Sequence, residues 1–223
     1  MSHFLTRIDL NPRRRGTARL LASPHRIHGA VNACFTPSQR PSRPLWRIDR
    51  TPAGTRLYVV SDVEPDPTSV LEEYGWPLAD SWRTRDYAPV LEAVSEGDVF
   101  AFRLTANPVH DALIPPRPGS DRGPRKQRVA HVTATQQLEW FRSRCDGWGV
   151  MVTAPGTGVE IVDRRVLEFP RQGRTVTVGT ATFEGVLQVS EAAELRRRLV
   201  EGIGHAKAYG CGLLTLAPVS AVP

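Results

Sequence analysis

Apolar and polar residues alternate in several short stretches of the chain, and this alternation predicts β-strands. In the first half, strands are expected at residues 3–10, 45–50, 56–63 and 99–105. Helical spacing of apolar residues predicts helices at residues 24–35 and 67–74. The resulting order, β α β β α β, is that of a ferredoxin-like domain.

The second half of the chain has a similar pattern. Thr133 and Gln136 form the sequence signature of a capping box, which predicts a helix running to Asp146. Strands at residues 149–153, 159–169 and 175–189, a helix at 190–200 and a strand at 213–219 follow. If residues 128–132 supply a first strand, this half also reads β α β β α β. We therefore expect an α+β protein with two tandem ferredoxin-like (RRM-like) domains.

A segment rich in proline and glycine separates the two halves, and its composition excludes a regular helix or central strand. The expected limits are residues 1–107 for the N-terminal domain, 108–127 for a basic loop or linker, and 128–223 for the C-terminal domain with its glycine-rich loop. The loop is either a solvated linker or an arm that orders on a nucleic-acid backbone. Its candidate RNA-binding residues, with one just beyond it, are Arg117, Arg122, Arg125, Lys126 and Arg128.

Charge is unevenly distributed along the 223 residues, whose formal net charge is +6. Residues 1–60 carry a balance of +9 and residues 61–100 a balance of −8. This asymmetry suits a protein that binds a polyanion on one side and a protein partner on another. The acidic stretch from Asp62 to Asp98 either faces a partner subunit or is a solvated surface.

Cysteine spacing and hydropathy narrow the class of protein. The three cysteines have no CxxC spacing, so neither a disulfide framework nor a zinc ribbon is expected. No signal-peptide pattern follows Met1, and no apolar run approaches the ~18 residues of a membrane span. We expect a soluble, cytoplasmic protein that uses no metal and no other cofactor.

Residues 202–218, GIGHAKAYGCGLLTLAP, contain four glycines around His205 and Lys207. Glycine tolerates positive φ and lets another group approach the main chain closely, and amide N–H groups in such loops suit phosphate oxygens. The alternative is a helix C-cap followed by a tight turn. The segment follows a helical pattern and precedes a strand, which excludes a dinucleotide fingerprint. The candidate contact residues are Gly202, Gly204, Lys207, Gly210 and Gly212.

A pair of histidines lies at a predicted helix start. Ser23 as N-cap and Pro24 as first residue place His25 and His28 three residues apart in the first turns. A helix N-terminus attracts phosphate and disfavours imidazolium, which keeps a histidine available as a proton acceptor. RNA cleavage without metal needs a base for the 2′-hydroxyl, an acid for the leaving 5′-oxygen and positive charge at the phosphorane. His28, with His25 or Lys207, can supply this set.

Other chemistry of these histidines is less well supported. A zinc site lacks a third ligand at a recognisable spacing. His131 begins an HxT motif of two-histidine phosphoesterases, but the required second copy is absent. A histidine with only a packing role is the remaining alternative.

Four segments, at residues 23–28, 100–108, 182–189 and 202–218, resemble the CasE family, the CRISPR RNA-processing endoribonucleases of type I-E systems. The resemblance implies tandem ferredoxin-like domains and metal-independent cleavage of repeat RNA beside a stem-loop, through attack by a 2′-hydroxyl. It implies two kinds of partner, the CRISPR repeat RNA stem-loop and the other subunits of the type I-E Cascade complex, and no membrane. It also implies that the enzyme stays bound to its product.

The resemblance places the family's catalytic histidine on His28. His25 occupies a place where a tyrosine is common, so it either replaces the tyrosine in catalysis or binds phosphate. The glycine-rich segment is expected to pack beside the active site, with Lys207 as a phosphate contact, and Arg26 and Arg103 are further RNA-binding candidates. Two alternatives remain, a non-catalytic RNA-binding subunit of a CRISPR ribonucleoprotein and a basic RNA-binding module outside CRISPR.

Overall fold

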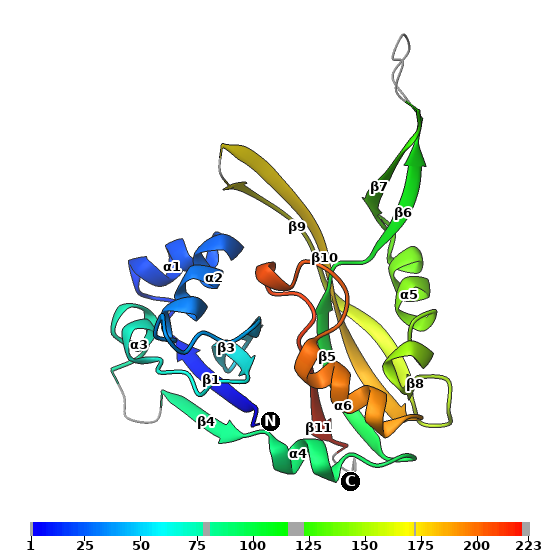
Figure 1. Ribbon diagram of the computed structural model, residues 1–223, viewed down its shortest axis with the longest axis horizontal. Coiled ribbons are helices and arrows are strands. Elements are labelled where there is room, and N and C mark those ends of the chain that lie inside the picture. Colours follow the sequence, from blue (N-terminus) through cyan, green and yellow to red (C-terminus); the bar gives the residue numbers. More distant parts are fainter. Residues whose placement is uncertain (1, 78–80, 116–122, 172, 220–223) are drawn as a thin grey trace.

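The computed structural model describes residues 2–77, 81–115, 123–171 and 173–219 (Figure 1). Its first sheet is fully antiparallel and has the strand order β2-β3-β1-β4. The strands are β1 (Phe4–Leu10), β2 (Leu45–Thr51), β3 (Gly54–Ser61) and β4 (Trp82–Asp86). Three helices pack on one face of the sheet, namely α1 (Arg15–Leu21), α2 (Pro24–Ala33) and α3 (Thr68–Tyr74).

The second sheet is also antiparallel, with the order β11-β5-β10-β8 and β9 paired with β10. Its strands are β5 (Val99–Ala106), β8 (Val150–Met151), β9 (Gly158–Arg171), β10 (Arg174–Val189) and β11 (Leu214–Pro218). The helical segments of this half are α5 (Ala134–Arg142), η1 (Asp146–Trp148), α6 (Ala192–Glu201) and η2 (Lys207–Tyr209). The first strand of each unit, β1 or β5, lies between the unit's last two strands. The prediction of two tandem ferredoxin-like domains is therefore confirmed.

The strand assignment of the first domain was wrong at its end. Residues 99–105 were expected to close the first sheet, but β5 pairs with β10 and β11 in the second. The fourth strand of the first sheet is β4, which the sequence analysis missed together with α1 and α4 (Ala88–Ala93). Its sequence, WRTRD, lacks apolar alternation because it is a largely exposed edge strand. Residues 99–107 thus belong with the second unit, not the first.

The predicted linker begins with regular structure. Strand β6 (Val109–Ile114) pairs with β7 (Arg125–Ala130) in a separate two-stranded sheet that stands off the second unit (Figure 1). Residues 128–132 therefore do not supply a first strand for that unit, because β7 pairs with β6 alone. Arg117 and Arg122 lie outside the described residues. The limits of independently folding domains stay a prediction.

Two hydrophobic cores explain how the units are joined. One core lies under α1 to α3, where Leu20, Ile27 and Val31 pack on the sheet. The other includes Leu45 and Val60 of the first sheet together with residues of the second unit. Burial of apolar surface stabilises by about 25 cal/mol per Å². The shared core holds α2 beside the glycine-rich segment that follows α6.

The second unit extends into a long arm. Strands β9 and β10 pair well beyond their neighbours, and the end of β9 arches toward α2 (Figure 1). Helix α5 starts with the predicted capping box, in which Thr133 and Gln136 satisfy each other's backbone N–H groups. In the part of the chain that the structure describes, no helix is both long and apolar enough to cross a bilayer.

Candidate active site

His28 is placed by the predicted helix start. Ser23 is the N-cap of α2, with an extended backbone, and Pro24 is the first helical residue. The serine side chain makes no cap hydrogen bond, but its carbonyl accepts from the backbone N–H groups of Arg26 and Ile27 at 3.0 and 3.2 Å. Ile27 is buried in the first core and anchors the helix. The next residue, His28, borders a cavity between the two units.

We name this space the catalytic cavity after the role expected of His28, and it has a volume of about 510 Å³. Its walls come from α2, from residues 41–44, from the end of β9 and from the glycine-rich segment. The structure thereby brings His28 and Lys207 to one site, although they lie near opposite ends of the chain. The polar and glycine residues at its walls include His28, Asn32, Arg43, Arg171, Gly204, Lys207 and Tyr209.

Hydrogen bonding and burial set the state of His28. Asn32, one turn later on α2, donates from Nδ2 to His28 Nε2 at 3.2 Å, so Nδ1 carries the proton of the neutral ring. Nδ1 is buried, with no hydrogen-bond partner among the described residues. Burial lowers the pKa of His28 below its usual 6.5, and the charges of His25 and Arg171 lower it further. His28 is therefore a neutral proton acceptor at pH 7.

His25 and Arg26 lie outside the catalytic cavity. Both side chains are exposed in the first turn of α2, and neither borders the cavity as His28 does. The two histidines that were predicted to act as a pair thus have different surroundings, because His28 borders the cavity and His25 is exposed to solvent. His25 reaches the site through its charge, which disfavours protonation of His28.

Two cations flank the cavity opposite α2. Lys207 Nζ donates to the backbone carbonyl of Glu201 at 2.8 Å, and burial followed by the charge of Arg43 lowers the pKa of Lys207. Arg171, at the end of β9, donates to the hydroxyl of Tyr209 and lies over its ring. Positive charge from two separate elements therefore meets at the site.

Three of the four glycines pack against protein. Gly202, Gly210 and Gly212 are buried with φ of 77°, 83° and 93°. A Cβ would lie 2.7 Å from a methyl group of Leu45 at Gly202 and 2.6 Å from the Trp46 ring at Gly210. Close approach was predicted correctly, but the group approached at these positions is the protein itself. Gly202 is also the C-cap of α6, as the alternative interpretation had it.

Gly204 differs from the other three glycines. It is exposed, has φ of 70°, and borders the catalytic cavity. A Cβ there would meet only the ring of Trp140, at 3.7 Å. Of the four, Gly204 is the one that borders the catalytic cavity, where its main chain can contact a ligand.

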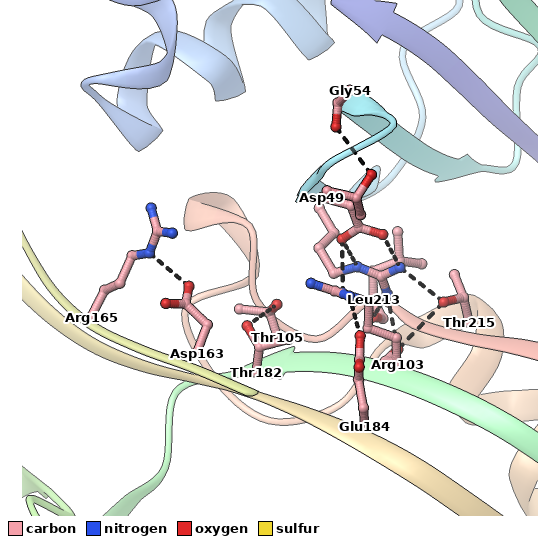
Figure 2. Close-up of polar contacts among 12 residues, drawn as sticks. Asp49, Gly54, Arg103, Thr105, Asp163, Arg165, Thr182, Glu184, Leu213 and Thr215 are labelled. Carbon is pink, nitrogen blue, oxygen red and sulfur yellow. Dashed lines mark hydrogen bonds and ion pairs between the residues drawn. The ribbon is translucent and has the colours of Figure 1, made fainter. Parts of the chain in front are cut away.

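Arg103 is held by carboxylates rather than open to solvent. Its Nε lies 3.3 Å from Asp49 Oδ1, and its Nη1 donates to Glu184 on the neighbouring strand β10 (Figure 2). It borders a different cleft from the one that contains His28. These ion pairs could not be predicted from the sequence, because both carboxylates come from strands distant in the chain.

The basic residues of β7 are exposed. Arg125, Lys126 and Arg128 follow one strand, and Arg128 makes only a long ion pair of 3.7 Å with Asp111 on β6. Burial, followed by the charge of Arg128, lowers the pKa of His205, which borders the catalytic cavity. The charge of this hairpin thus acts on one residue in the wall of that cavity.

Several site residues were missed from the sequence. Asn32 lies four residues after His28, a helical spacing that was available as a signal. Arg43, Arg171 and Tyr209 had no signal, because they reach the cavity from three elements far apart in the chain. Within the described ranges, no group of three or more His, Cys, Asp or Glu side chains could hold a metal ion.

The family model described as "CRISPR associated protein" matches residues 3–218. The chain belongs to this family. It is 29% identical over 227 residues to the CRISPR-associated endoribonuclease Cse3 of Thermus thermophilus, covering 96% of this chain and 100% of the relative. It is 33% identical over 119 residues to the CRISPR system Cascade subunit CasE of Escherichia coli K12, covering 53% of this chain and 57% of the relative.

A solved structure has the same fold over nearly the whole length of this chain. It is Thermus thermophilus Cse3 bound to an RNA representing a pre-cleavage complex, with a TM-score of 0.78 and 28% identity. The match covers 98% of this chain and 100% of that one. The resemblance to the CasE family expected from the four segments is confirmed.

Proposed function

We propose that this chain is a metal-independent endoribonuclease that cleaves CRISPR repeat RNA beside a stem-loop and so produces mature CRISPR RNA. The observation that carries the proposal is the catalytic cavity, in which a neutral His28 faces Lys207 and Arg171. Cleavage by a 2′-hydroxyl requires a base, an acid and positive charge, and a histidine that becomes an acid once protonated can supply the first two beside these cations. The Thermus relative, named an endoribonuclease and solved with RNA before cleavage, supports the same activity.

The reaction follows from these groups. Nε2 is the unprotonated ring nitrogen of His28, and it exchanges its hydrogen bond from Asn32 for one from the 2′-hydroxyl and accepts that proton. The oxygen then attacks the adjacent phosphorus. The bond from phosphorus to the 5′-oxygen of the next nucleotide breaks, which leaves a 2′,3′-cyclic phosphate and a 5′-hydroxyl. The leaving oxygen takes up one proton, and the imidazolium formed in the first step is an acid strong enough to supply it. Lys207 and Arg171 stabilise the negative charge of the phosphorane.

Asn32 orients the base in this mechanism. Its Nδ2 group holds His28 Nε2 at 3.2 Å and selects one ring tautomer. Asn32 is thus a positioning residue, since it acts through His28. The exposed His25 acts on the same ring by charge alone.

The RNA stem is assigned to the exposed cations of β7. Double-stranded RNA is recognised mainly through its shape and backbone, which suits arginine and lysine side chains free to contact phosphates. Arg125, Lys126 and Arg128 meet this requirement, and Arg26 is exposed in the first turn of α2. Arg103 meets it less well, because carboxylates already occupy its guanidinium.

The chain's protein partners are the other subunits of a type I-E Cascade complex. The Escherichia coli relative, named a Cascade subunit, supports this part of the proposal. We assign the protein to the cytoplasm, where its RNA substrate is transcribed.

A second candidate function is a subunit that binds repeat RNA without cutting it. The specific observation in its favour is His25, which occupies the place where the family commonly has a tyrosine. His25 is exposed and lies outside the catalytic cavity, so its position does not allow it to take over the role that the tyrosine has in the family.

One experiment separates the two functions. The purified protein is incubated in EDTA with a repeat RNA hairpin carrying single-stranded flanks, and with the same RNA containing a 2′-deoxy sugar at the cleavage nucleotide. The endoribonuclease cuts the all-ribose RNA at one site, yields a cyclic phosphate, and leaves the deoxy RNA intact. Tight binding of both RNAs without cutting supports the non-catalytic subunit instead.

A further inference from the structure

A second and larger cleft lies beside the catalytic cavity, with a volume of about 620 Å³. We call it the interdomain cleft. Helix α2 and strand β2 of the first unit form one wall, and strands β5, β9 and β10 of the second form the other. Its volume lies within the usual range for small-ligand sites. His28 does not border it, so the mechanism above leaves this cleft without a role.

The walls of the interdomain cleft combine apolar and polar surfaces. Pro24, Ile27 and Trp46 contribute from the first unit, and Val162 and Val166 contribute from β9. Val166 is 70% exposed, so its side chain is accessible to a ligand in the cleft. An apolar, flat-sided ligand such as a nucleobase would fit between these walls.

Hydrogen-bonding groups line the base of the cleft. The hydroxyl groups of Thr105 and Thr182 bond to each other at 2.9 Å, next to Glu184 (Figure 2). Trp46 is only 2% exposed, yet its indole N–H has no partner among the described residues. Leaving a buried donor unpaired costs about 1–3 kcal/mol. Because this nitrogen is itself out of contact with solvent, a ligand in the cleft does not reach it, and the threonine hydroxyl groups and Glu184 are the hydrogen-bonding groups of the wall.

Two arginines on opposite walls supply positive charge. Arg50 comes from β2 and Arg165 from β9, and the charge of Arg165 adds to burial in lowering the pKa of Arg50. Arg165 pairs with Asp163 at 2.6 Å (Figure 2), and this carboxylate offsets part of the repulsion between the two arginines. Glu168 and Glu184 also border the cleft. An anion between the two arginines would relieve their remaining repulsion.

The interdomain cleft adjoins the catalytic cavity. Tyr209 borders both spaces, and Gly210 follows it on the side of the cleft. Arg171 fixes the ring of Tyr209 through its hydroxyl. An RNA strand whose phosphate lies between His28 and Lys207 can therefore pass Tyr209 and enter the cleft.

We propose that the interdomain cleft binds one unpaired nucleotide of the RNA strand that is cut at His28. The base packs between Ile27 and Val166 with its polar edge toward Thr182 and Glu184, and its phosphate lies between Arg50 and Arg165. This inference rests on the proposed function. It adds a contact with the single-stranded flank of the RNA, separate from the grip of β7 on the stem.

The test compares two RNAs on two protein variants by equilibrium binding. One RNA is the repeat hairpin with single-stranded flanks, and the other is the same hairpin trimmed of its flanks. Both carry the 2′-deoxy sugar, so that no cleavage occurs during the measurement. The variant R50Q/R165Q removes the two cleft arginines that are assigned to the phosphate, and the control R19Q/R142Q removes two exposed arginines that border neither space.

The proposal predicts that R50Q/R165Q weakens binding of the flanked RNA by about tenfold, as expected for loss of charged hydrogen bonds. Binding of the trimmed hairpin should change no more than it does for R19Q/R142Q. Equal weakening of both RNAs, or no weakening of either, overturns the cleft as a nucleotide site while leaving the proposed function intact. Failure of the unmodified protein to bind either RNA overturns the proposed function itself.

A second pair of substrates keeps the proposal testable if R50Q/R165Q does not fold. Unmodified protein is measured with flanked RNAs in which one unpaired position at a time, on either side of the cleavage site, is abasic. Loss of affinity at a single position identifies the nucleotide in the cleft. Equal affinities for all abasic RNAs contradict a site for one base.

Discussion

Two sets of arginines in this protein have the same chemistry and opposite surroundings. Arg47, on β2, is 2% exposed, and all five of its N–H donors are used. Asp49 accepts from Nε and Nη2 at 2.7 and 2.9 Å, and Thr215 accepts from Nη2 at 2.9 Å. The carbonyl groups of Arg103 and Leu213 accept from Nη1, each at 2.9 Å. Arg47 therefore joins the first sheet to β5 and β11 of the second.

The cations of β7 have weaker and exposed partners. Arg125, Lys126 and Arg128 lie on a two-stranded hairpin, where Arg125 donates to Gln127 at 3.3 Å and Arg128 lies 3.7 Å from Asp111. The contrast shows that the number of arginines in a basic sequence does not measure its capacity to bind RNA. Burial and competing acceptors decide which arginines stabilise the fold and which remain available for phosphate.

The glycines repeat this contrast on a smaller scale. Gly210 is pressed against Trp46, whereas Gly204 is exposed at the catalytic cavity. Both have positive φ, so the backbone conformation alone does not separate them. The group that each glycine faces separates a packing role from a binding role.

The largest effect on stability is expected from Arg47→Met. Removing the guanidinium leaves the buried Asp49 short of its main partner, and breaking a buried ion pair in this way costs about 3–5 kcal/mol. Urea denaturation monitored by circular dichroism measures the loss in free energy of unfolding. The matched variant Arg128→Met should lie within about 0.5 kcal/mol of the unmodified protein. Similar small losses for both variants would remove the distinction between the two sets.

Gly210→Ala should destabilise more than Gly204→Ala. Both substitutions place a side chain at positive φ, which costs roughly 1–2 kcal/mol. At Gly210 the new Cβ would also lie 2.6 Å from the Trp46 ring, whereas at Gly204 the nearest atom is 3.7 Å away. Thermal unfolding of the two variants measures the difference. Equal melting temperatures would mean that Trp46 moves aside freely.

Neutralising β7 should affect RNA binding and leave stability unchanged. The variant R125Q/K126Q/R128Q loses up to three phosphate contacts, and each contact contributes about 0.7–0.9 to the slope of log K against log salt. The slope should therefore fall by about 2 to 3. Titrations of the repeat hairpin at several salt concentrations give this number. A slope equal to that of the unmodified protein would make the hairpin a linker without RNA contact.

His25→Ala should shift the pH dependence of cleavage with little change in its maximal rate. The charge of His25 lowers the pKa of His28, so its removal raises that pKa and moves the acid limb of the rate profile to higher pH. Single-turnover rates measured from about two pH units below to about 1.5 units above the ordinary histidine pKa of 6.5 give the shift. A large loss of maximal rate with no shift would instead make His25 a catalytic group.

The lowered pKa of His28 also affects stability. A histidine that is harder to protonate when folded adds stability that is fully present above its unfolded pKa of 6.5. This stability is lost as the pH falls through the lower pKa of the folded protein. His28→Ala should therefore flatten the acid side of the stability profile.

Local patterns predicted much of the fold because strands and helix starts are local features. The start of α2 at Pro24 and the capping box of α5 followed from a few adjacent residues. The sheet to which β5 belongs could not be predicted, because its alternation is the same whichever sheet it joins. Edge strand β4 has no buried face to reveal it.

The candidate site was predicted in part for a similar reason. His28 and Lys207 stood out through the residues around them, and the fold places both at one cavity. Arg171 and Arg43 did not, because their role depends on where β9 and the segment before β2 come to lie. The ion pairs of Arg103 could not be predicted, because Asp49 and Glu184 come from other strands.

The central claim is that His28 is the base of an RNA-cleaving site, and His28→Ala tests it most directly. Single-turnover cleavage of flanked repeat RNA in EDTA is measured beside the affinity for the 2′-deoxy RNA. Loss of the base should slow cleavage by about 10²–10⁴-fold. The Kd should stay within about threefold, since one neutral side chain contributes little to binding a polyanion. Cleavage by His28→Ala at the rate of the unmodified protein would contradict the account.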